Sequence, residues 1–305
     1  MALPSPIIDF AAVGKVIMSS IQLNSKFFIL FFLDYYAAKI RFYTEQIENI
    51  PYFCTRKRAI IMLTTIFLVF FLTIVASFIQ RVTGFGFGIF VMMFFPYILP
   101  TFGECITLSG LLAGTTSLLI ALRNWRYIRW RLIGTVLLFN IVASYIAIEY
   151  MASLSNAGMK CTFGMALILI ALYFLFFDGR LKMLGQSRPA QAGVGIVSGI
   201  MGGMFAMPGP PIVLYSIGVI GDKREYVATL QALFFTLNVF YTLFRLKVGF
   251  FADSTLTLWA FGLIGCFLGA WAGARLFRLI SLPLLKKIVY LLMIVSGMVA
   301  VWPSI

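Results

Sequence analysis

The sequence contains no histidine and only ten acidic residues in 305. Its four cysteines are scattered without a Cys-x-x-Cys pair, at Cys54, Cys105, Cys161 and Cys266. These absences argue against a zinc or haem site, so we expect no metal and no cofactor. They also argue against a membrane-embedded enzyme, because neither paired aspartates for a bound metal nor a nucleophile elbow is present. We therefore name no catalytic residue.

Charged residues are scarce as well, at 11% of the chain against 62% hydrophobic residues. A soluble globular domain carries about 25% charged residues, so the composition excludes one. The formal net charge of +14 could indicate a nucleic-acid partner. Lys and Arg, however, lie between the apolar runs, where the positive-inside rule puts cytoplasmic loops. We expect a lipid bilayer around the chain, a small anionic solute as its partner, and no nucleic acid.

Apolar runs of about 20 residues, enough to cross the hydrocarbon core, recur along the chain, without the alternating pattern of a membrane barrel. The sequence therefore predicts an all-α polytopic integral membrane protein with about seven or eight transmembrane helices. Gly265, Gly269 and Gly273 recur at every fourth position of one run, which predicts close helix packing. Complete spans are expected at residues 59–79, 105–122, 132–150, 157–177, 226–243, 256–274 and 284–301.

The order of these runs predicts two membrane repeats. The N-terminal extension either holds an interfacial helix at 21–47 or lies upstream of a true start codon at Met62. In each repeat a broken element precedes the spans, and Glu104 and Glu225 occupy matching places at the head of the next span. The parts are an N-terminal extension, a first membrane repeat, a cytoplasmic loop and a second membrane repeat, at residues 1–58, 59–177, 178–189 and 190–305.

Glycine and proline interrupt two of the apolar runs. The first break is Arg-Val-Thr-Gly-Phe-Gly-Phe-Gly at residues 81–88, leading into a short apolar piece at 87–99. The second is Met-Gly-Gly-Met-Phe-Ala-Met-Pro-Gly-Pro-Pro at residues 201–211, inside the run 190–220. In a bilayer a loosened backbone survives only where protein or a water-filled cavity satisfies its polar groups. Each break therefore predicts a broken helix or a re-entrant segment, and one half of a binding site.

A broken helix offers unpaired N–H groups and the positive end of a dipole, so the breaks predict an anion site. Arg81 would supply the only full positive charge near either break, unless it is a structural arginine at a helix end. The predicted substrate-binding residues are Gln80, Arg81, Thr83, Gly84, Gly86, Gly202, Gly203, Pro208, Gly209 and Pro210. Three amides within spans are predicted on the translocation path or, alternatively, in interhelical hydrogen bonds: Asn140, Gln231 and Asn238.

The basic residues predict the orientation. Residues 56–58 are all basic and the loop 123–131 carries four arginines, so both are expected in the cytoplasm. If the run 190–220 enters and returns on one side, the repeats are inverted, as in many secondary transporters, and the loop 245–250 lies outside. If that run crosses once, the repeats are parallel. We favour the inverted arrangement, with a cytoplasmic N-terminus.

Two segments resemble the signature segments of the TauE/SafE sulfite-exporter permeases. They are Thr-Gly-Phe-Gly-Phe-Gly at residues 83–88, followed by Pro96, and residues 199–215, in which Gly-Pro-Pro precedes Ile-Val-Leu-Tyr. Met207-Pro208 stands where the family often has glycine. The resemblance, over residues 60–302, implies secondary transport of small sulfur-containing or organic anions such as sulfite, sulfonates or sulfoacetate.

The same resemblance implies a location in the bacterial cytoplasmic membrane. A passive anion channel is the nearest alternative, because two broken helices suit a channel as well as a transporter. The two differ in energetics, since flux through a channel follows only the anion's own gradient. A homodimer is one assembly that we consider.

Overall fold

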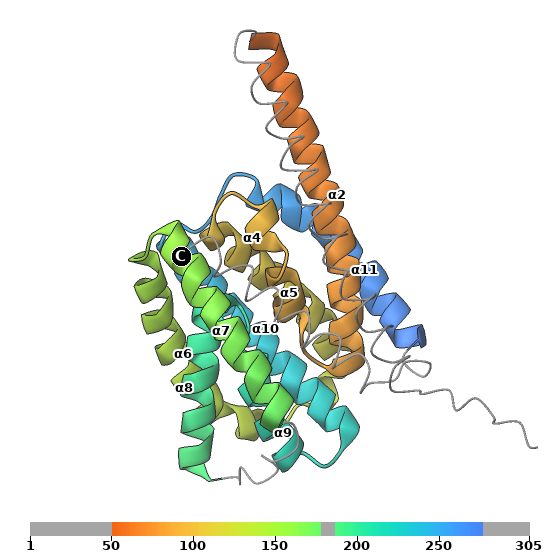
Figure 1. Ribbon diagram of the computed structural model, residues 1–305. Coiled ribbons are helices and arrows are strands. Elements are labelled where there is room, and N and C mark those ends of the chain that lie inside the picture. Colours follow the sequence, from red (N-terminus) through yellow and green to blue (C-terminus); the bar gives the residue numbers. More distant parts are fainter. Residues whose placement is uncertain (1–50, 178–186, 277–305) are drawn as a thin grey trace, which may run out of the picture. The chain divides into compact units, whose positions relative to one another are not determined.

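The computed structural model describes residues 51–177 and 187–276, and all the regular structure in these ranges is helical (Figure 1). The chain divides into two compact units, Met1–Met62 and Leu63–Ile305, and every contact given below lies within the second. The helices are α2 (Pro51–Thr83), α3 (Phe87–Met92), α4 (Phe95–Ile98), α5 (Phe102–Arg123), η1 (Trp125–Tyr127), α6 (Trp130–Ala152), α7 (Asn156–Phe177), α8 (Arg188–Phe205), α9 (Gly209–Val219), α10 (Lys223–Lys247) and α11 (Thr255–Leu276).

Five helices in the described ranges are long and apolar enough to cross a membrane: Ile60–Thr83, Phe102–Arg123, Trp130–Ala152, Arg224–Lys247 and Thr255–Arg275. Each coincides with a predicted span, which confirms the polytopic all-α class. Helix α7 coincides with the predicted span 157–177. The predicted span 284–301 lies outside the described residues.

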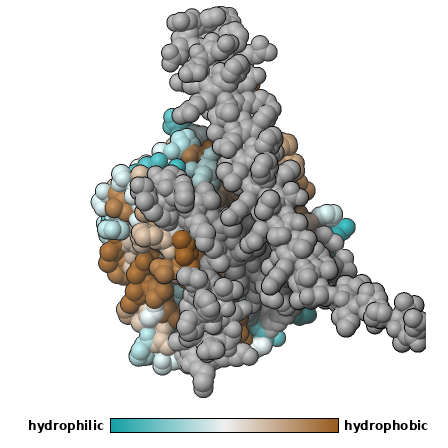
Figure 2. All heavy atoms as spheres, in the orientation of Figure 1, coloured by the Kyte–Doolittle hydropathy of each residue, from teal (hydrophilic) through white to brown (hydrophobic). Residues whose placement is uncertain are grey.

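Large apolar side chains are exposed along the outer faces of several helices. Leu138, Val142 and Ile146, four residues apart on α6, are 61%, 55% and 62% exposed and form one stripe. Figure 2 shows apolar residues gathered on the described part of this face, with hydrophilic residues above and below them. A surface of this kind suits the acyl chains of a bilayer.

Polar caps fix where α5 and α10 begin. Thr101 Oγ1 accepts a hydrogen bond from the Glu104 N–H at 3.2 Å. Asp222 Oδ1 accepts from the N–H groups of Arg224 and Glu225, both at 2.9 Å. Such caps satisfy N–H groups that lack a partner within the helix. Glu104 and Glu225 thus lie in the first turn of the helix after each broken element, in the matching places that the sequence predicted.

Helices α2, α3 and α4 form a hairpin. Gly84 and Gly86 follow α2 with φ of 86° and 100°, a conformation that residues with a side chain rarely adopt. Near the end of α2, Gln80 Nε2 donates to Ser117 Oγ near the end of α5 at 2.9 Å. Because α5 begins directly after α4, the helices α3 and α4 carry the chain back to the start of α5. The predicted short piece 87–99 is therefore the returning arm of a hairpin.

Helices α8 and α9 form a second hairpin. Ala206, which follows α8, has a φ of 58°, a conformation that costs a non-glycine residue about 1–2 kcal/mol. The last turn of α9, with Ser216, shares a small cavity with Ile133 at the start of α6 and Thr229 near the start of α10. Helix α8 starts at this same end, because it runs parallel to α6. Residues 188–219 therefore enter and return on one side, as the favoured reading of the run 190–220 required.

The parallel contact between α6 and α8 depends on three glycines four residues apart. A Cβ on Gly195, Gly199 or Gly203 would lie 2.7, 2.6 or 2.8 Å from a carbonyl oxygen of α6. These carbonyls belong, in order, to Val136, Asn140 and Ser144. The order rises along both helices, so they point the same way. A side chain larger than hydrogen would push the two backbones apart.

The glycine stripe of α11 packs against α2, as the sequence predicted. A Cβ on Gly265 would lie 2.6 Å from the Phe70 carbonyl oxygen, and one on Gly269 would collide with the Ile74 carbonyl oxygen. Gly273 continues the contact one turn later against Arg81. Close packing of two helix backbones is thus the role of these glycines.

Helices α2 and α5 run in the same direction. A Cβ on Gly262 of α11 would touch both Thr73 of α2 and Leu112 of α5, and further along both helices Gln80 bonds to Ser117. The predicted topology made these two spans antiparallel, and on this point it is wrong. The reason is the first hairpin, which returns the chain to its starting end before α5 begins.

Candidate functional site

The two breaks lie against each other. A Cβ on Gly88 would collide with the carbonyl oxygen of Ala206, and one on Gly209 would lie 3.4 Å from Phe85 Cβ. Between them is a cavity of about 30 Å³, which we call the central cavity. This is room for about two water molecules. The breaks contribute to its lining Phe85, Gly86, Phe87, Gly88, Ile89, Ala206, Met207, Pro208 and Gly209.

The rest of the lining comes from long helices. Ala113 lies near the middle of α5, and Phe234 and Asn238 lie near the middle of α10. Gln80 of α2 and Ser117 of α5 complete it. The central cavity is thus at half the height of α5 and α10. Secondary transporters commonly hold their substrates at this depth, between discontinuous helices.

Polar side chains at the cavity are buried and only partly satisfied. Gln80 Nε2 donates to Ser117 Oγ at 2.9 Å and to Gln231 Oε1 at 3.1 Å. Gln80 Oε1 and Asn238 Oδ1 have no hydrogen-bond partner among the described residues. Buried polar atoms are normally paired, and these two are amide oxygens, so beside a cavity they are suited to an occupant that donates a hydrogen bond, such as water or a protonated oxyanion.

The start of α3 presents backbone donors to the same space. The first hydrogen bond of this helix runs from the Phe90 N–H to the Gly86 carbonyl at 2.9 Å. The N–H groups of Phe87, Gly88 and Ile89, all cavity-lining residues, are therefore not used within the helix.

The start of α9 differs from that of α3. Pro208 precedes it, and Pro210 and Pro211 lie in its first turn. Proline has no N–H group, so only Gly209 retains a backbone donor here. The prolines also favour the helical geometry of a first turn. They therefore fix the break in place, while most backbone donors to the cavity come from α3.

A chain of hydrogen bonds holds the second break to α6 and α10. Tyr241 Oη donates to Asn140 Oδ1 at 2.7 Å, and Asn140 Nδ2 donates to Ser198 Oγ at 3.0 Å. Ser198 Oγ in turn donates to the Pro208 carbonyl at 2.7 Å. Asn140 and Ser198 are fully buried. Asn140 thus takes the interhelical role that the sequence left open, one step behind the cavity lining.

Arg245 is a residue that the sequence analysis placed wrongly. It was expected in an external loop at 245–250, but α10 continues through it and its side chain is fully buried. Its guanidinium donates to Ile106 O at 2.8 Å and to Gly202 O and Gly203 O at 2.7 and 3.2 Å. Arg81 is therefore not the only positive charge near a break.

Space for this guanidinium comes from Gly110 of α5, where a Cβ would lie 2.7 Å from Arg245 Nη1. No carboxylate of the described residues pairs with it. A positive charge beside the last carbonyls of α8 is favourable, because those carbonyls are the negative end of the helix dipole. The one sequence signal was an arginine just two residues beyond the predicted span 226–243.

A second, larger space lies next to the central cavity, and we call it the basic hollow. Its volume is about 480 Å³, and Gln80 lines both spaces. Arg81 and Arg224 supply its charge. No carboxylate of the described residues lines it, and neither arginine forms an ion pair with any of them. The remaining lining residues are Val82, Thr83, Gly84, Ile120, Asn124, Ile217, Tyr226, Val227, Gln231, Gly273 and Ala274.

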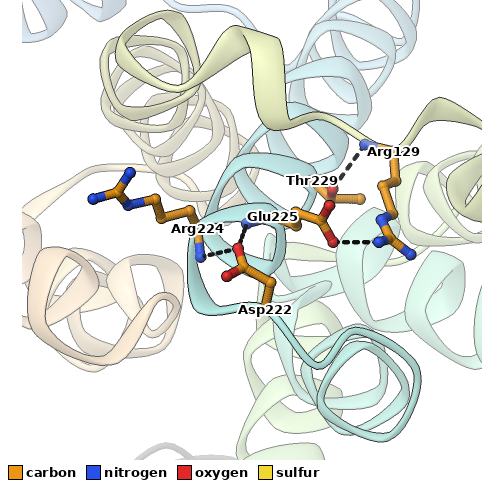
Figure 3. Close-up of polar contacts among 5 residues, drawn as sticks. All are labelled: Arg129, Asp222, Arg224, Glu225 and Thr229. Atoms are coloured by element: carbon orange, nitrogen blue, oxygen red, sulfur yellow. Dashed lines mark hydrogen bonds and ion pairs between the residues drawn. The ribbon is translucent and has the colours of Figure 1, made fainter.

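Figure 3 shows why the nearby carboxylates leave Arg224 unpaired. Asp222 accepts from the backbone N–H groups of Arg224 and Glu225 and so caps α10. Glu225 pairs with Arg129 at 2.6 Å, and Thr229 Oγ1 accepts from the Arg129 N–H at 3.0 Å. The side chain of Arg224 extends away from both carboxylates (Figure 3).

The structure divides the predicted site residues among three places. The central cavity is lined by Gln80, Gly86, Pro208, Gly209 and Asn238. The basic hollow is lined by Gln80, Arg81, Thr83, Gly84 and Gln231. Contacts away from both spaces involve Asn140, Gly202, Gly203 and Pro210: Asn140 is in the hydrogen-bonded chain, Gly202 makes room for the Tyr241 hydroxyl, Gly203 packs on α6, and Pro210 is buried in the first turn of α9.

These features define the class of protein. It is a polytopic α-helical membrane protein in which two helical hairpins enter from opposite ends and enclose a polar cavity with their tips.

The chain belongs to the family described as Sulfite exporter TauE/SafE, whose pattern matches residues 69–300. A relative from Comamonas testosteroni, described as "Probable inner membrane transporter protein TsaS", is 28% identical over 187 residues, covering 57% of this chain and 73% of the relative. No solved structure matches the chain. The family is one of membrane transporters, in agreement with the resemblance found in the two breaks.

Proposed function

We propose that the chain is a secondary transporter that moves small sulfur oxyanions, such as sulfite or the head group of a sulfonate, across the bacterial cytoplasmic membrane. The anion binds in the central cavity. The observation that carries the proposal is that both breaks line this one cavity. The family membership and the inner-membrane description of the relative support the class and the location.

The chemistry of the cavity suits an oxyanion. Backbone N–H groups at the start of α3 and at Gly209 point to the binding of oxygen atoms that carry negative charge. Glycine at positions 88 and 209 lets the two breaks approach each other, so that both backbones line the cavity. With room for about two waters, the cavity favours a head group of a few atoms over an aromatic ring.

We infer that the end with the arginine-rich loop 123–131 faces the cytoplasm. The other described arginines at this end are Arg81, Arg188, Arg224 and Arg275, and the positive-inside rule favours this side for them. The Leu63 end of α2 then faces outside. This differs from the expectation, based on the basic residues 56–58, that the first span starts in the cytoplasm.

The repeats 59–177 and 190–305 are proposed to be inverted copies of each other. The first hairpin opens toward one end and the second toward the other, and each is followed by a long helix that begins with a polar cap and an early glutamate. Alternating access would then come from movement of one repeat against the other around the central cavity.

The test is flux of radiolabelled sulfite, sulfoacetate and taurine in proteoliposomes that contain the full chain, with and without an imposed proton gradient. We expect saturable flux of at least one anion that the gradient drives against the anion's own gradient. Flux that only follows the anion's gradient would indicate a passive channel. Absence of flux for every anion would overturn the substrate class.

Gly209→Ala tests whether the anion binds between the breaks. Its added methyl group would lie 3.4 Å from Phe85 Cβ and project into the contact between the breaks. One extra methyl group in a fitted site changes discrimination by about tenfold or more, so we expect at least a tenfold loss of flux. Gly193→Ala is the matched control, since a Cβ there has nothing within 4 Å. Equal flux in the two variants would contradict the proposed site.

A further inference from the structure

We propose that the basic hollow is a second anion-binding site, which recruits small organic sulfonates and related oxyanions before they enter the central cavity. The inference rests on the proposed transport function and adds to it a charged site in series with the cavity. The hollow holds about 480 Å³ against about 30 Å³. It therefore has room for the carbon chain of an organic sulfonate as well as its head group.

Charge is the first support. Arg81 and Arg224 both line the hollow and form no ion pair with any residue that the structure describes. Like charges held together without a carboxylate attract an anion to the space between them, and a low-dielectric wall strengthens that attraction.

The backbone of Arg224 and the stem of Arg81 are held by rigid elements. A Cβ on Gly273 would lie 2.9 Å from Arg81 Cβ and 3.1 Å from Arg81 Cγ, so the stem of Arg81 packs directly on the backbone of α11. Arg224 lies in the first turn of α10, which Asp222 caps. Its guanidinium carbon lies 6.0 Å from the centre of the Tyr127 ring. The planar fork of an arginine also loses less freedom per hydrogen bond when it binds an oxyanion.

The neutral donors of the hollow are largely occupied. Gln231 Nε2 donates to Gly84 O at 2.8 Å, and Asn124 Nδ2 donates to Ile120 O at 3.0 Å. Thr83 Oγ1 donates to Phe85 O at 2.5 Å. These groups hold the first break and the end of α5 in place. Charge for binding in the hollow therefore comes from the two arginines, with the Tyr226 hydroxyl as a further neutral donor in the lining.

Gln80 separates the hollow from the central cavity. It lines both spaces, and its amide joins Ser117 and Gln231 across α5 and α10. An anion in the hollow reaches the cavity only after this amide moves aside. The two sites are thus in series, with the hollow at the end that carries the loop 123–131.

A thiol placed in the hollow tests the proposal without needing transport. Val227→Cys introduces it between Arg224 and Gln231 on α10, in the full chain with Cys54 and Cys161 replaced by serine. The purified protein is treated with two methanethiosulfonate reagents, one carrying a sulfonate and one a quaternary ammonium group. Ser153→Cys, at the exposed end of α6, is the matched control position.

We expect the sulfonate reagent to react faster than the cationic one at position 227, with a rate ratio above that at position 153. Arg81→Gln and Arg224→Gln, which keep the aliphatic stem, should each lower the ratio at position 227 at least about threefold and leave position 153 unchanged. Millimolar sulfoacetate should slow the reaction at position 227 only.

Three results would overturn the proposal: a ratio at position 227 equal to that at position 153, a ratio that neither arginine variant changes, or no protection by sulfoacetate. A chain that carries no anion in proteoliposomes but shows the arginine-dependent ratio and the protection would contradict the proposed transport and support the binding site. The two failures are therefore distinguishable.

Discussion

Arg245 binds the last turn of α8, which is the first arm of the second hairpin. Replacing this arginine should therefore destabilise the hairpin. Its guanidinium makes three hydrogen bonds to backbone carbonyls, on Ile106, Gly202 and Gly203. Hydrogen bonds from a charged group contribute about 1.5–3 kcal/mol each. Removing the charge also removes its desolvation penalty of several kcal/mol, so the net loss is smaller than the sum of the three bonds.

The carbonyls left behind set the size of that loss for Arg245→Met. Gly202 O keeps a bond from the Ala206 N–H at 3.0 Å, whereas Gly203 O loses the side-chain partner that it has here. One unsatisfied buried carbonyl costs about 1–3 kcal/mol. Arg245→Lys keeps the charge buried but loses the fork of donors, so we expect it to be no more stable than Arg245→Met.

The assay is thermal unfolding of the purified chain in detergent, with proteoliposome flux measured on the same samples. For a chain of this size 1 kcal/mol shifts the apparent Tm by about 2–4 °C, so Arg245→Met should lower it by about 2–12 °C. Flux should also fall, and by more than the loss of folded protein accounts for, because the tip of this hairpin lines the central cavity. An Arg245→Lys variant with native Tm and native flux would refute the argument that the fork is required.

Three other variants test separate contacts. Gly269→Ala should lower the apparent Tm by several degrees, because its Cβ collides with a carbonyl of α2. Gly134→Ala is the control and should not lower the Tm, because a Cβ there has nothing within 4 Å. Equal Tm values for the two variants would count against the glycine stripe as a packing contact. Gln80→Leu keeps the shape but loses the amide bonds to α5 and α10 and leaves the buried Gln231 Oε1 without its donor, so we expect maximal flux to fall about tenfold and the apparent Tm to fall by several degrees; native flux would exclude Gln80 as the separating group. Ser198→Ala should cost about 1–3 kcal/mol, measured as a lower Tm, since it leaves the carbonyl at the second break unpaired, and an unchanged Tm would show that this bond is not needed.

Composition and run length predicted the helices well. Apolar runs of the right length become membrane helices because a helix satisfies all its backbone hydrogen bonds within one segment in lipid, so α2, α5, α6, α10 and α11 appear where the runs are. The two breaks were predictable for the same reason, since glycine and proline interrupt helices through their own backbone chemistry.

Direction and long-range contacts were less accessible. Whether residues 87–99 continue outward or turn back depends on Gly84 and Gly86 adopting positive φ and on Gln80 meeting Ser117, a contact across 37 residues. The distribution of charge among loops does not indicate such a turn. The topology predicted from charge alone was therefore wrong at the first hairpin.

The site was predicted in part for a similar reason. Backbone-breaking residues mark themselves in the sequence, so Gly86, Pro208 and Gly209 were found, and they line one cavity. Arg245 was missed because its carbonyl partners lie about 40 and 140 residues away in the chain, and only the fold brings them together. The binding role of the predicted residues stays a prediction.

Binding of the anion between the two breaks is tested most directly by diffraction from the chain crystallised with selenite, a heavier analogue of sulfite whose selenium scatters anomalously. The account predicts an anomalous selenium peak in the central cavity, with selenite oxygens placed to accept hydrogen bonds from the backbone N–H groups of Gly88 or Gly209. A peak in the basic hollow alone, or no peak in a crystal soaked at a concentration that saturates flux, would contradict binding between the breaks.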